Sequence, residues 1–256
     1  MKIGVFDSGV GGLTVLKALL ELHAQADFVY LGDTARVPYG DKSAQTVIRY
    51  SLECAEFLMG EGIELLVVAC NTASSHAIEV LRERLPVPVF GVIEPGVSRA
   101  LSTTCKGKVG VIGTRATISS GVYQRLLQER GVEVFPKACP LFVPMVEEGI
   151  LSGGIAREVV AYYLQELKDK DIDTLILGCT HYPLLRPLIE EFMGEGVKVV
   201  DSAESLAVQI EPFVKKGGSS RLELFFTDRS PSLEFLVELL LGKLVDYKLL
   251  TLSCKV

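Results

Sequence analysis

Residues 65–72 read LLVVACNT, and residues 174–181 read TLILGCTH. Both are short apolar runs that end in a cysteine followed by small polar residues. Continuous runs of Leu, Val and Ile of this length are typical of parallel strands that are buried on both faces. Open α/β sheets place their ligands beyond the carboxyl ends of such strands. The pattern therefore predicts that two strands each deliver one thiol, Cys70 and Cys179, to a ligand site.

Strand and helix patterns alternate along the chain, and the alternation starts again near residue 108. Strands are expected in a first series at 2–6, 27–31, 63–69 and 88–93, and in a second series at 108–112, 132–136, 173–178 and 197–200. Helical patterns lie near 11–24, 43–60, 74–85, 117–130, 154–169 and 183–194. This alternation indicates an α/β fold, with parallel sheets that are covered by helices.

The second series looks like a repeat of the first. KIGVFD at residues 2–7 resembles KVGVIG at residues 108–113, an offset of 106 positions, and the two strand-end cysteines are 109 positions apart. We therefore predict two similar doubly wound parallel-sheet domains that face each other across a cleft. A cleft of this kind is a natural ligand site. Each domain then contributes one thiol to the same pocket.

A tail beyond residue 201 has no counterpart in this two-unit scheme. It contains a helical segment, the stretch KKGGSS at residues 215–220, a strand pattern at 222–226 and a helical pattern near 231–241. The Gly/Ser stretch predicts a linker or turn.

The composition excludes several classes of protein. A chain of 256 residues can bury a core without disulfides. Its six cysteines are never closer than sixteen positions, so there is no C-x-x-C pair and no metal site is expected. The formal net charge is −6 and no basic run is present, so nucleic acid is not an expected partner.

The amino terminus begins directly with a strand pattern and lacks the apolar segment of a secretory signal. The chain also has no stretch of eighteen uninterrupted apolar residues that would predict a membrane span. We therefore expect a cytoplasmic protein without a membrane partner, in a compartment that keeps thiols reduced.

Two thiols on opposite sides of a bound carbon atom suit a reaction that inverts a stereocentre. One group removes a proton from one face while the other returns a proton to the opposite face. A free thiol has a pKa of ~8.5, so modest tuning allows both protonation states near neutrality. The alternative is that both cysteines are inert, because free cysteine often packs as a small apolar side chain. The chain would then be a two-lobed binding protein.

Three further side chains are candidates for tuning the thiols. Asp7 ends the first strand and precedes the loop SGVGG at residues 8–12, whose backbone amides can approach a ligand closely. The loop is not a dinucleotide fingerprint, because Thr14 stands where the third glycine is needed. An aspartate at this place can also be a simple helix cap. His181 can share the proton of Cys179 or bind a substrate carboxylate. Glu147 is either a partner for the second thiol or a solvated helix-end carboxylate.

Four segments together resemble the cofactor-independent glutamate racemases. They are FDSGVGGLTV at residues 6–15, GDTARVPYG at 32–40, ACNTAS at 69–74 and GCTHYPLL at 178–185. The resemblance extends from residue 2 to about residue 230. It implies interconversion of L- and D-glutamate without pyridoxal phosphate, metal or nucleotide, to supply D-glutamate for peptidoglycan. Racemisation of aspartate or another acidic amino acid on the same architecture is the alternative.

The resemblance also implies roles for individual residues. Cys70 and Cys179 become the two bases, Asp7 assists Cys70, and Glu147 and His181 assist Cys179. The implied substrate-binding residues are Asp7, Ser8, Tyr39, Gly40, Asn71, Thr72, Thr180 and His181, with Thr114 and Thr117 as further candidates. The family implies a homodimer and a first domain that is completed by the carboxyl-terminal segment. We therefore assign residues 1–97 and 208–256 to the first domain and residues 98–207 to the second.

Overall fold

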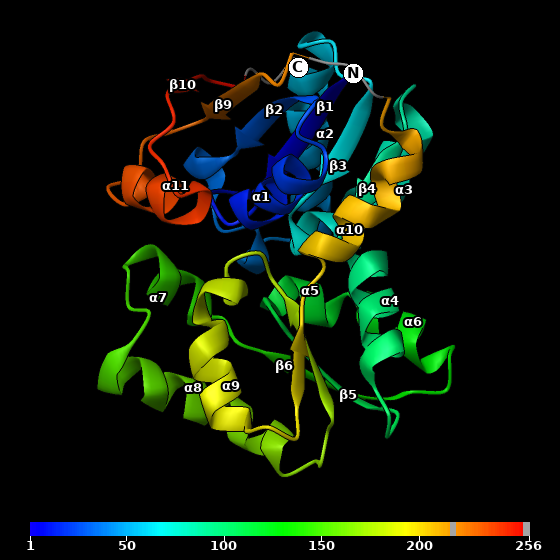
Figure 1. Ribbon diagram of the computed structural model, residues 1–256, viewed down its shortest axis with the longest axis vertical. Coiled ribbons are helices and arrows are strands. Elements are labelled where there is room, and N and C mark those ends of the chain that lie inside the picture. The colour runs from blue at the N-terminus through cyan, green and yellow to red at the C-terminus, as the bar shows by residue number, and fades with distance from the viewer. Residues whose placement is uncertain (216–218, 253–256) are drawn as a thin grey trace.

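Two parallel sheets form the framework of the protein. The computed structural model describes residues 1–215 and 219–252. In these residues the first sheet has six strands in the order β10-β9-β2-β1-β3-β4, and the second has four in the order β6-β5-β7-β8. All neighbouring strands are parallel. Figure 1 shows the two sheets in separate lobes, the first above the second. The prediction of two parallel-sheet α/β domains is confirmed.

The strands of the first sheet are β1 (Lys2–Asp7), β2 (Asp27–Gly32), β3 (Leu65–Val68), β4 (Val89–Gly91), β9 (Leu222–Phe226) and β10 (Tyr247–Leu249). Those of the second are β5 (Lys108–Gly113), β6 (Glu133–Ala138), β7 (Thr174–Gly178) and β8 (Lys198–Val200). The order β2-β1-β3-β4 is the same as the order β6-β5-β7-β8. This shared order supports the internal repeat that the sequence suggested.

Helices cover both faces of each sheet. They are α1 (Leu13–Leu22), α2 (Ala44–Gly60), α3 (Asn71–Arg84), α4 (Ile93–Thr103), α5 (Arg115–Ser119), α6 (Val122–Gln128), α7 (Phe142–Glu147), α8 (Gly153–Lys168), α9 (Arg186–Met193), α10 (Ala203–Ile210) and α11 (Leu233–Leu241). Short 3-10 turns lie at Thr34–Arg36, Tyr39–Asp41, Tyr182–Leu185 and Glu211–Phe213.

Strand periodicity explains how the first sheet acquires two cores. Successive side chains of a strand point to opposite faces, so Leu65 and Val67 of β3 pack in the core that includes α1, whereas Leu66 and Val68 pack in the core beneath α2 and α3. Every residue of β3 is buried, and the same is true of β7. The two runs that opened the sequence are therefore central, fully covered strands, as their composition predicts.

Two elements differ from the sequence prediction. The helical pattern at 117–130 is divided into α5 and α6, because Gly121 between them has a left-handed backbone with φ of 69°. Helix α4 was not predicted, and it contains Pro95. Pro95 lies in the first turn, where a missing backbone N–H costs nothing.

The unpartnered tail completes the first sheet. Strand β9 pairs with β2, and β10, which was not predicted, pairs with β9. The predicted linker KKGGSS falls partly on residues 216–218, which lie outside the described residues.

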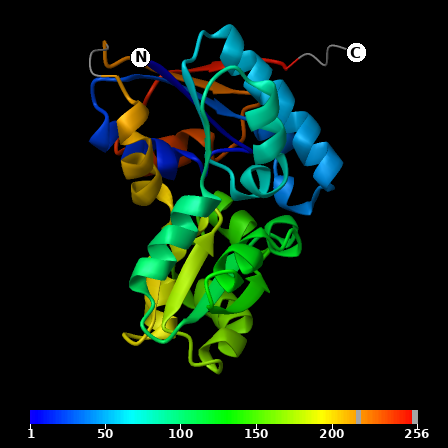
Figure 2. The same cartoon turned by 90° about the vertical axis from the view of Figure 1, so that its right-hand side faces the viewer.

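Both domain boundaries of the sequence prediction fall inside helices. Helix α4 packs against β7 and α6, and α10 packs against α1, as Figures 1 and 2 show. The domain limits stay a prediction. These contacts favour a chain that passes from one domain to the other just before α4 and returns just before α10.

Within the described residues, no helix combines the length and apolar character that crossing a membrane requires.

The start of β7 is fixed by Asp173, which is buried. Its carboxylate accepts hydrogen bonds of 2.6 Å from the Thr104 hydroxyl and from the backbone N–H groups of Cys105 and Lys106. Burial alone would raise the pKa of Asp173, but these hydrogen bonds outweigh burial and lower the pKa below its ordinary value of 3.8.

We expect Asp173→Asn to lower the free energy of unfolding by about 1–3 kcal/mol, because an amide leaves buried donors without an acceptor. Since the pKa is lowered in the folded state, the difference from wild type should be full at neutral pH and decrease as the pH falls below 3.8. Urea denaturation at several pH values measures it. The control is Asp171→Asn, which removes an exposed pair with Lys106 and should leave the stability almost unchanged. Equal effects of the two substitutions would contradict the stabilising role assigned to Asp173.

Candidate active site

A cavity lies where the carboxyl ends of the two sheets meet. Cys70, two residues after β3, and Cys179, directly after β7, both line it. Seven of the eight predicted substrate-binding residues line it as well: Ser8, Tyr39, Gly40, Asn71, Thr72, Thr180 and His181. The eighth, Asp7, is fully buried behind the wall. The two thiols that the sequence singled out therefore share one cavity.

Cys70 lies at the amino-terminal cap of α3. Its sulfur accepts a hydrogen bond from the backbone N–H of Ala73 at 3.4 Å, and its S–H donates to the hydroxyl of Ser8 at 3.5 Å. Burial raises the pKa of Cys70 to about 12, and the nearby Asp7 acts in the same direction, whereas the contacts with Ser8 and Ala73 lower it. Cys70 therefore carries its proton at neutral pH.

Asp7 lies behind Cys70 and connects the two domains. Its carboxylate accepts hydrogen bonds from the backbone N–H of Gly9 at 2.9 Å and from the hydroxyl of Thr180 at 3.3 Å. Burial raises the pKa of Asp7, while the charge of His181 and the hydrogen bonds from Gly12, Gly9 and Thr180 oppose that rise. Helix α1 is capped at Gly12 without a side-chain bond, so Asp7 is not its cap.

Cys179 has a histidine and a glutamate aligned behind it. Nδ1 of His181 lies 3.9 Å from Sγ of Cys179, and Nε2 lies 3.2 Å from Oε1 of Glu147, the last residue of α7. Burial alone would lower the pKa of His181, but its contacts with Cys179 and Glu147 outweigh burial and raise the pKa to about 10. His181 is therefore a cation at neutral pH. Glu147 does not line the cavity and acts on it through His181.

Three threonine hydroxyls that come from both domains lie close together at the cavity. The Oγ1 atom of Thr72 lies 2.9 Å from that of Thr114 and 3.1 Å from that of Thr117. Thr72 comes from the first turn of α3, and Thr114 caps α5 in the other domain. The cluster supplies hydroxyl donors of the kind that suit a carboxylate. Thr117 touches the other two hydroxyls but is not part of the cavity lining.

Asn71 is held by a residue that the sequence did not reveal. Its Nδ2 donates to the hydroxyl of Tyr123 at 2.8 Å, and Tyr123 is fully buried on α6. A lone tyrosine on an amphipathic helix has no local pattern that would distinguish it from an ordinary core residue.

Gly11 explains why the loop after β1 is rich in glycine. A Cβ atom at this position would lie 2.5 Å from both Oγ1 of Thr180 and Nδ1 of His181. The first domain can therefore approach the Cys179 segment only because residue 11 has no side chain.

Among the described residues, no group of three or more His, Cys, Asp or Glu side chains is arranged to hold a metal ion. The five described cysteines are all free thiols, and of these Cys105 is exposed. Cys254 lies outside the described residues.

Comparison with known proteins identifies the family. The family model described as Asp/Glu/Hydantoin racemase matches residues 3–210. The chain belongs to this family. The sequence-based prediction of an enzyme of the racemase class is confirmed.

The relatives and solved structures that this racemase matches are glutamate racemases, the same group that its motifs resemble. A glutamate racemase of Aquifex pyrophilus is 62% identical over 96% of each chain. A solved structure of the glutamate racemase from that organism matches with a TM-score of 0.87 and covers 97% of this chain and 98% of its own. The glutamate racemase of Francisella tularensis, solved in complex with D-glutamate, is 34% identical with a TM-score of 0.90 over 98% of each chain. The predicted likeness to glutamate racemases is confirmed.

We expect Glu147→Gln to lower the pKa of His181 below about 10, because the variant loses the carboxylate that stabilises the imidazolium. NMR titration of the imidazole proton measures this pKa, and His181→Gln assigns the signal. Since the folded-state pKa is raised, the stability that Glu147 contributes should be present below pH 6.5 and disappear as the pH rises through about 10. Glu148→Gln, an exposed neighbour, is the control. A titration that Glu147→Gln leaves unchanged would remove Glu147 from the site.

Proposed function

We propose that this racemase interconverts L-glutamate and D-glutamate by a two-base mechanism. The observation that carries the proposal is that Cys70 and Cys179, from opposite domains, line the same cavity. The choice of glutamate is supported by the similarity to the glutamate racemases of Aquifex pyrophilus and Francisella tularensis.

In this mechanism one cysteine takes the α-proton of glutamate as a thiolate, and the other donates the proton of its thiol to the opposite face of the same carbon. The electron pair left by the removed proton forms the new C–H bond, so the configuration is inverted. The first cysteine ends as a thiol and the second as a thiolate. The reverse reaction then starts from that state.

The charges beside the two cysteines support different roles for them. The pKa of Cys70 at about 12 makes Cys70 the proton donor of the resting enzyme. Cys179 instead lies beside the His181 imidazolium, so the charges next to the two sulfur atoms differ. Asp7 would assist Cys70, and Glu147 would act through His181.

The remaining cavity residues would bind the substrate. The threonine hydroxyls of the two domains and the hydroxyl of Ser8 are available donors for the two carboxylates. Binding glutamate in one orientation can lower the barrier by about 7–11 kcal/mol, and each positioned acid or base contributes roughly 10²- to 10⁴-fold. These contributions replace the electron sink that a cofactor normally supplies.

The proposal includes a cellular role and an assembly. The resemblance to glutamate racemases implies that the product D-glutamate serves peptidoglycan synthesis in the cytoplasm. It also implies a homodimer, and the exposed side chains of Ile155 and Tyr162, two turns apart on α8, offer apolar surface for a second copy. Light scattering of the purified protein gives the oligomeric state.

The decisive experiment is proton exchange in heavy water. With wild type we expect the α-proton signal of L-glutamate to disappear by NMR and D-glutamate to form. Cys70→Ala and Cys179→Ala should each abolish turnover in both directions, because each direction needs one base and one acid. Cys105→Ser, at the exposed thiol, is the matched control and should retain wild-type activity. Turnover by either alanine variant at the wild-type rate would exclude the two-base mechanism.

Aspartate and other acidic amino acids are tested in the same assay. Faster exchange with aspartate than with glutamate would show that the alternative substrate of the sequence analysis is correct.

A further inference from the structure

A buried charged cluster lies directly behind one wall of the cavity. This wall is the loop 37–40 between β2 and α2, and all four of its residues line the cavity. Behind the loop, at the carboxyl end of β2, lies Asp33, which is fully buried. A buried carboxylate destabilises a protein unless it is paired and hydrogen-bonded. The partners of Asp33 therefore indicate what it does.

Asp33 binds three side chains from different places. Oδ2 accepts hydrogen bonds from Nε of Arg36 at 2.7 Å and from the hydroxyl of Tyr39. Oδ1 accepts from the hydroxyl of Thr227, just after β9, at 2.9 Å. Tyr39 lines the cavity, yet its hydroxyl donates to Asp33 inside the first domain.

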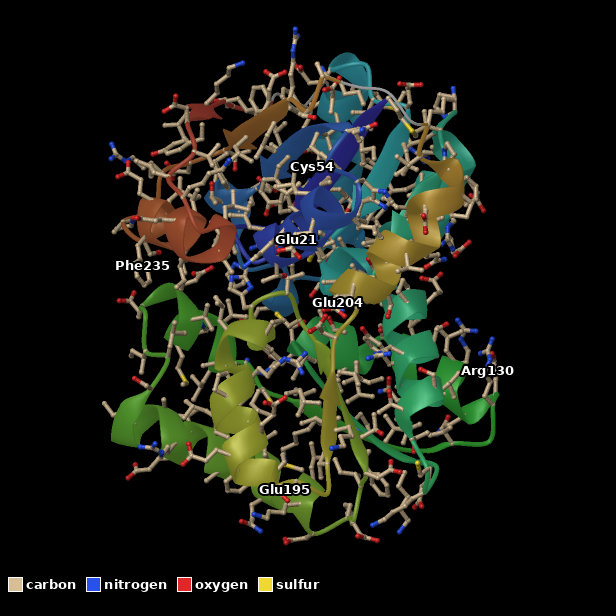
Figure 3. All side chains as sticks on the ribbon, in the orientation of Figure 1. Glu21, Cys54, Arg130, Glu195, Glu204 and Phe235 are labelled. Atoms are coloured by element: carbon tan, nitrogen blue, oxygen red, sulfur yellow. The ribbon has the colours of Figure 1, made fainter. Side chains whose placement is uncertain are left out.

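Arg36 ties the same loop to helix α2. Its guanidinium lies 4.0 Å from the centre of the Tyr50 ring and bonds to Glu53. Nη2 lies 3.8 Å from Sγ of Cys54, a residue that Figure 3 shows within the upper lobe. The loop is thus held on one side by the sheet, through Asp33, and on the other side by α2.

The loop in turn contacts the second domain. Gly40 is so close to Thr114 that a Cβ atom on Gly40 would lie 2.6 Å from Cβ of Thr114. The next residue, Asp41, pairs with Arg115 at 3.3 Å. Thr114 belongs to the threonine cluster on the cavity wall. A chain of direct contacts therefore runs from Asp33 through the loop to a hydroxyl that faces the cavity.

We infer that Asp33, Arg36 and Thr227 are positioning residues for substrate binding, and that the hydroxyl of Tyr39 anchors the loop 37–40 instead of binding the substrate. Tyr39 then lines the cavity without binding glutamate through its hydroxyl. The cluster acts on glutamate through the loop and does not touch it. This inference rests on the proposed racemase function.

Thr227→Val is the first test, because Thr227 is outside the cavity lining. The variant loses the hydrogen bond that the hydroxyl donates to Asp33 and the one that it accepts from the backbone N–H of Ala35, which lies in the same connection between β2 and α2. We expect the KM for glutamate to rise about tenfold, since a hydrogen bond to a charged group is lost, while kcat changes by less than about threefold. The pH profile of kcat should stay as in wild type, because both cysteines and their partners are unchanged.

Arg49→Met is the matched control. Arg49 also lies over the Tyr50 ring, at 5.1 Å, and pairs with Glu53, but it does not contact Asp33. Its removal should change KM by less than about twofold, as is usual for an exposed side chain. A KM that rises equally in both variants would overturn the inference, because the effect would then come from α2 in general.

A double-mutant cycle separates the two possible roles of the Tyr39 hydroxyl. If Tyr39 acts through Asp33, the double variant Asp33→Asn/Tyr39→Phe should have a KM no higher than that of the worse single variant. If the hydroxyl binds glutamate directly, the two effects multiply, and the inference is wrong. Circular dichroism at the assay temperature confirms that each variant is folded. Should Asp33→Asn fail to fold, Tyr39→Phe combined with Thr227→Val gives the same cycle.

The outcomes distinguish this inference from the function on which it rests. Wild-type enzyme without racemase activity on any acidic amino acid would overturn the proposed function. An active wild type together with a Thr227→Val variant of unchanged KM would overturn only the positioning role.

Discussion

The carboxyl ends of three parallel strands have to meet at one place, and the candidate active site depends on this constraint. Strands β1 and β3 bring Asp7 and Cys70 from one domain, and β7 brings Cys179 from the other. The hydrogen bond from Thr180 to Asp7 joins the two strand ends, and the bare backbone of Gly11 allows their approach. Without that approach the two sulfur atoms would face separate surfaces of two unconnected domains.

The duplicated architecture has produced two similar thiol positions with opposite electrostatic surroundings. Cys70 has a carboxyl group behind it, and burial keeps its proton in place. Cys179 has the cationic His181 beside it, which Glu147 stabilises. In the proposed two-base mechanism one cysteine starts as a thiol and the other as a thiolate, and the unlike neighbours of Cys70 and Cys179 distinguish the two positions. The repeat accounts for the similar positions of the two cysteines, and the different residues beside them account for their different electrostatic surroundings.

Local sequence patterns were sufficient for the central features. Buried parallel strands have an unmistakable composition, so β3 and β7 and the cysteines after them were predicted, and the motifs predicted most of the cavity lining. Contacts between distant segments were not predictable. The bond between Thr227 and Asp33 joins residues 194 positions apart, and the partnership of Tyr123 with Asn71 has no local signal either. Helix α4 was not predicted either.

The chain passes between the two lobes once between β4 and β5 and again between β8 and β9. The helices that follow these passages, α4 and α10, pack against each other, so both connections lie on the same side of the molecule. Two adjacent tethers permit rotation about the line that joins them and resist twisting of one lobe over the other.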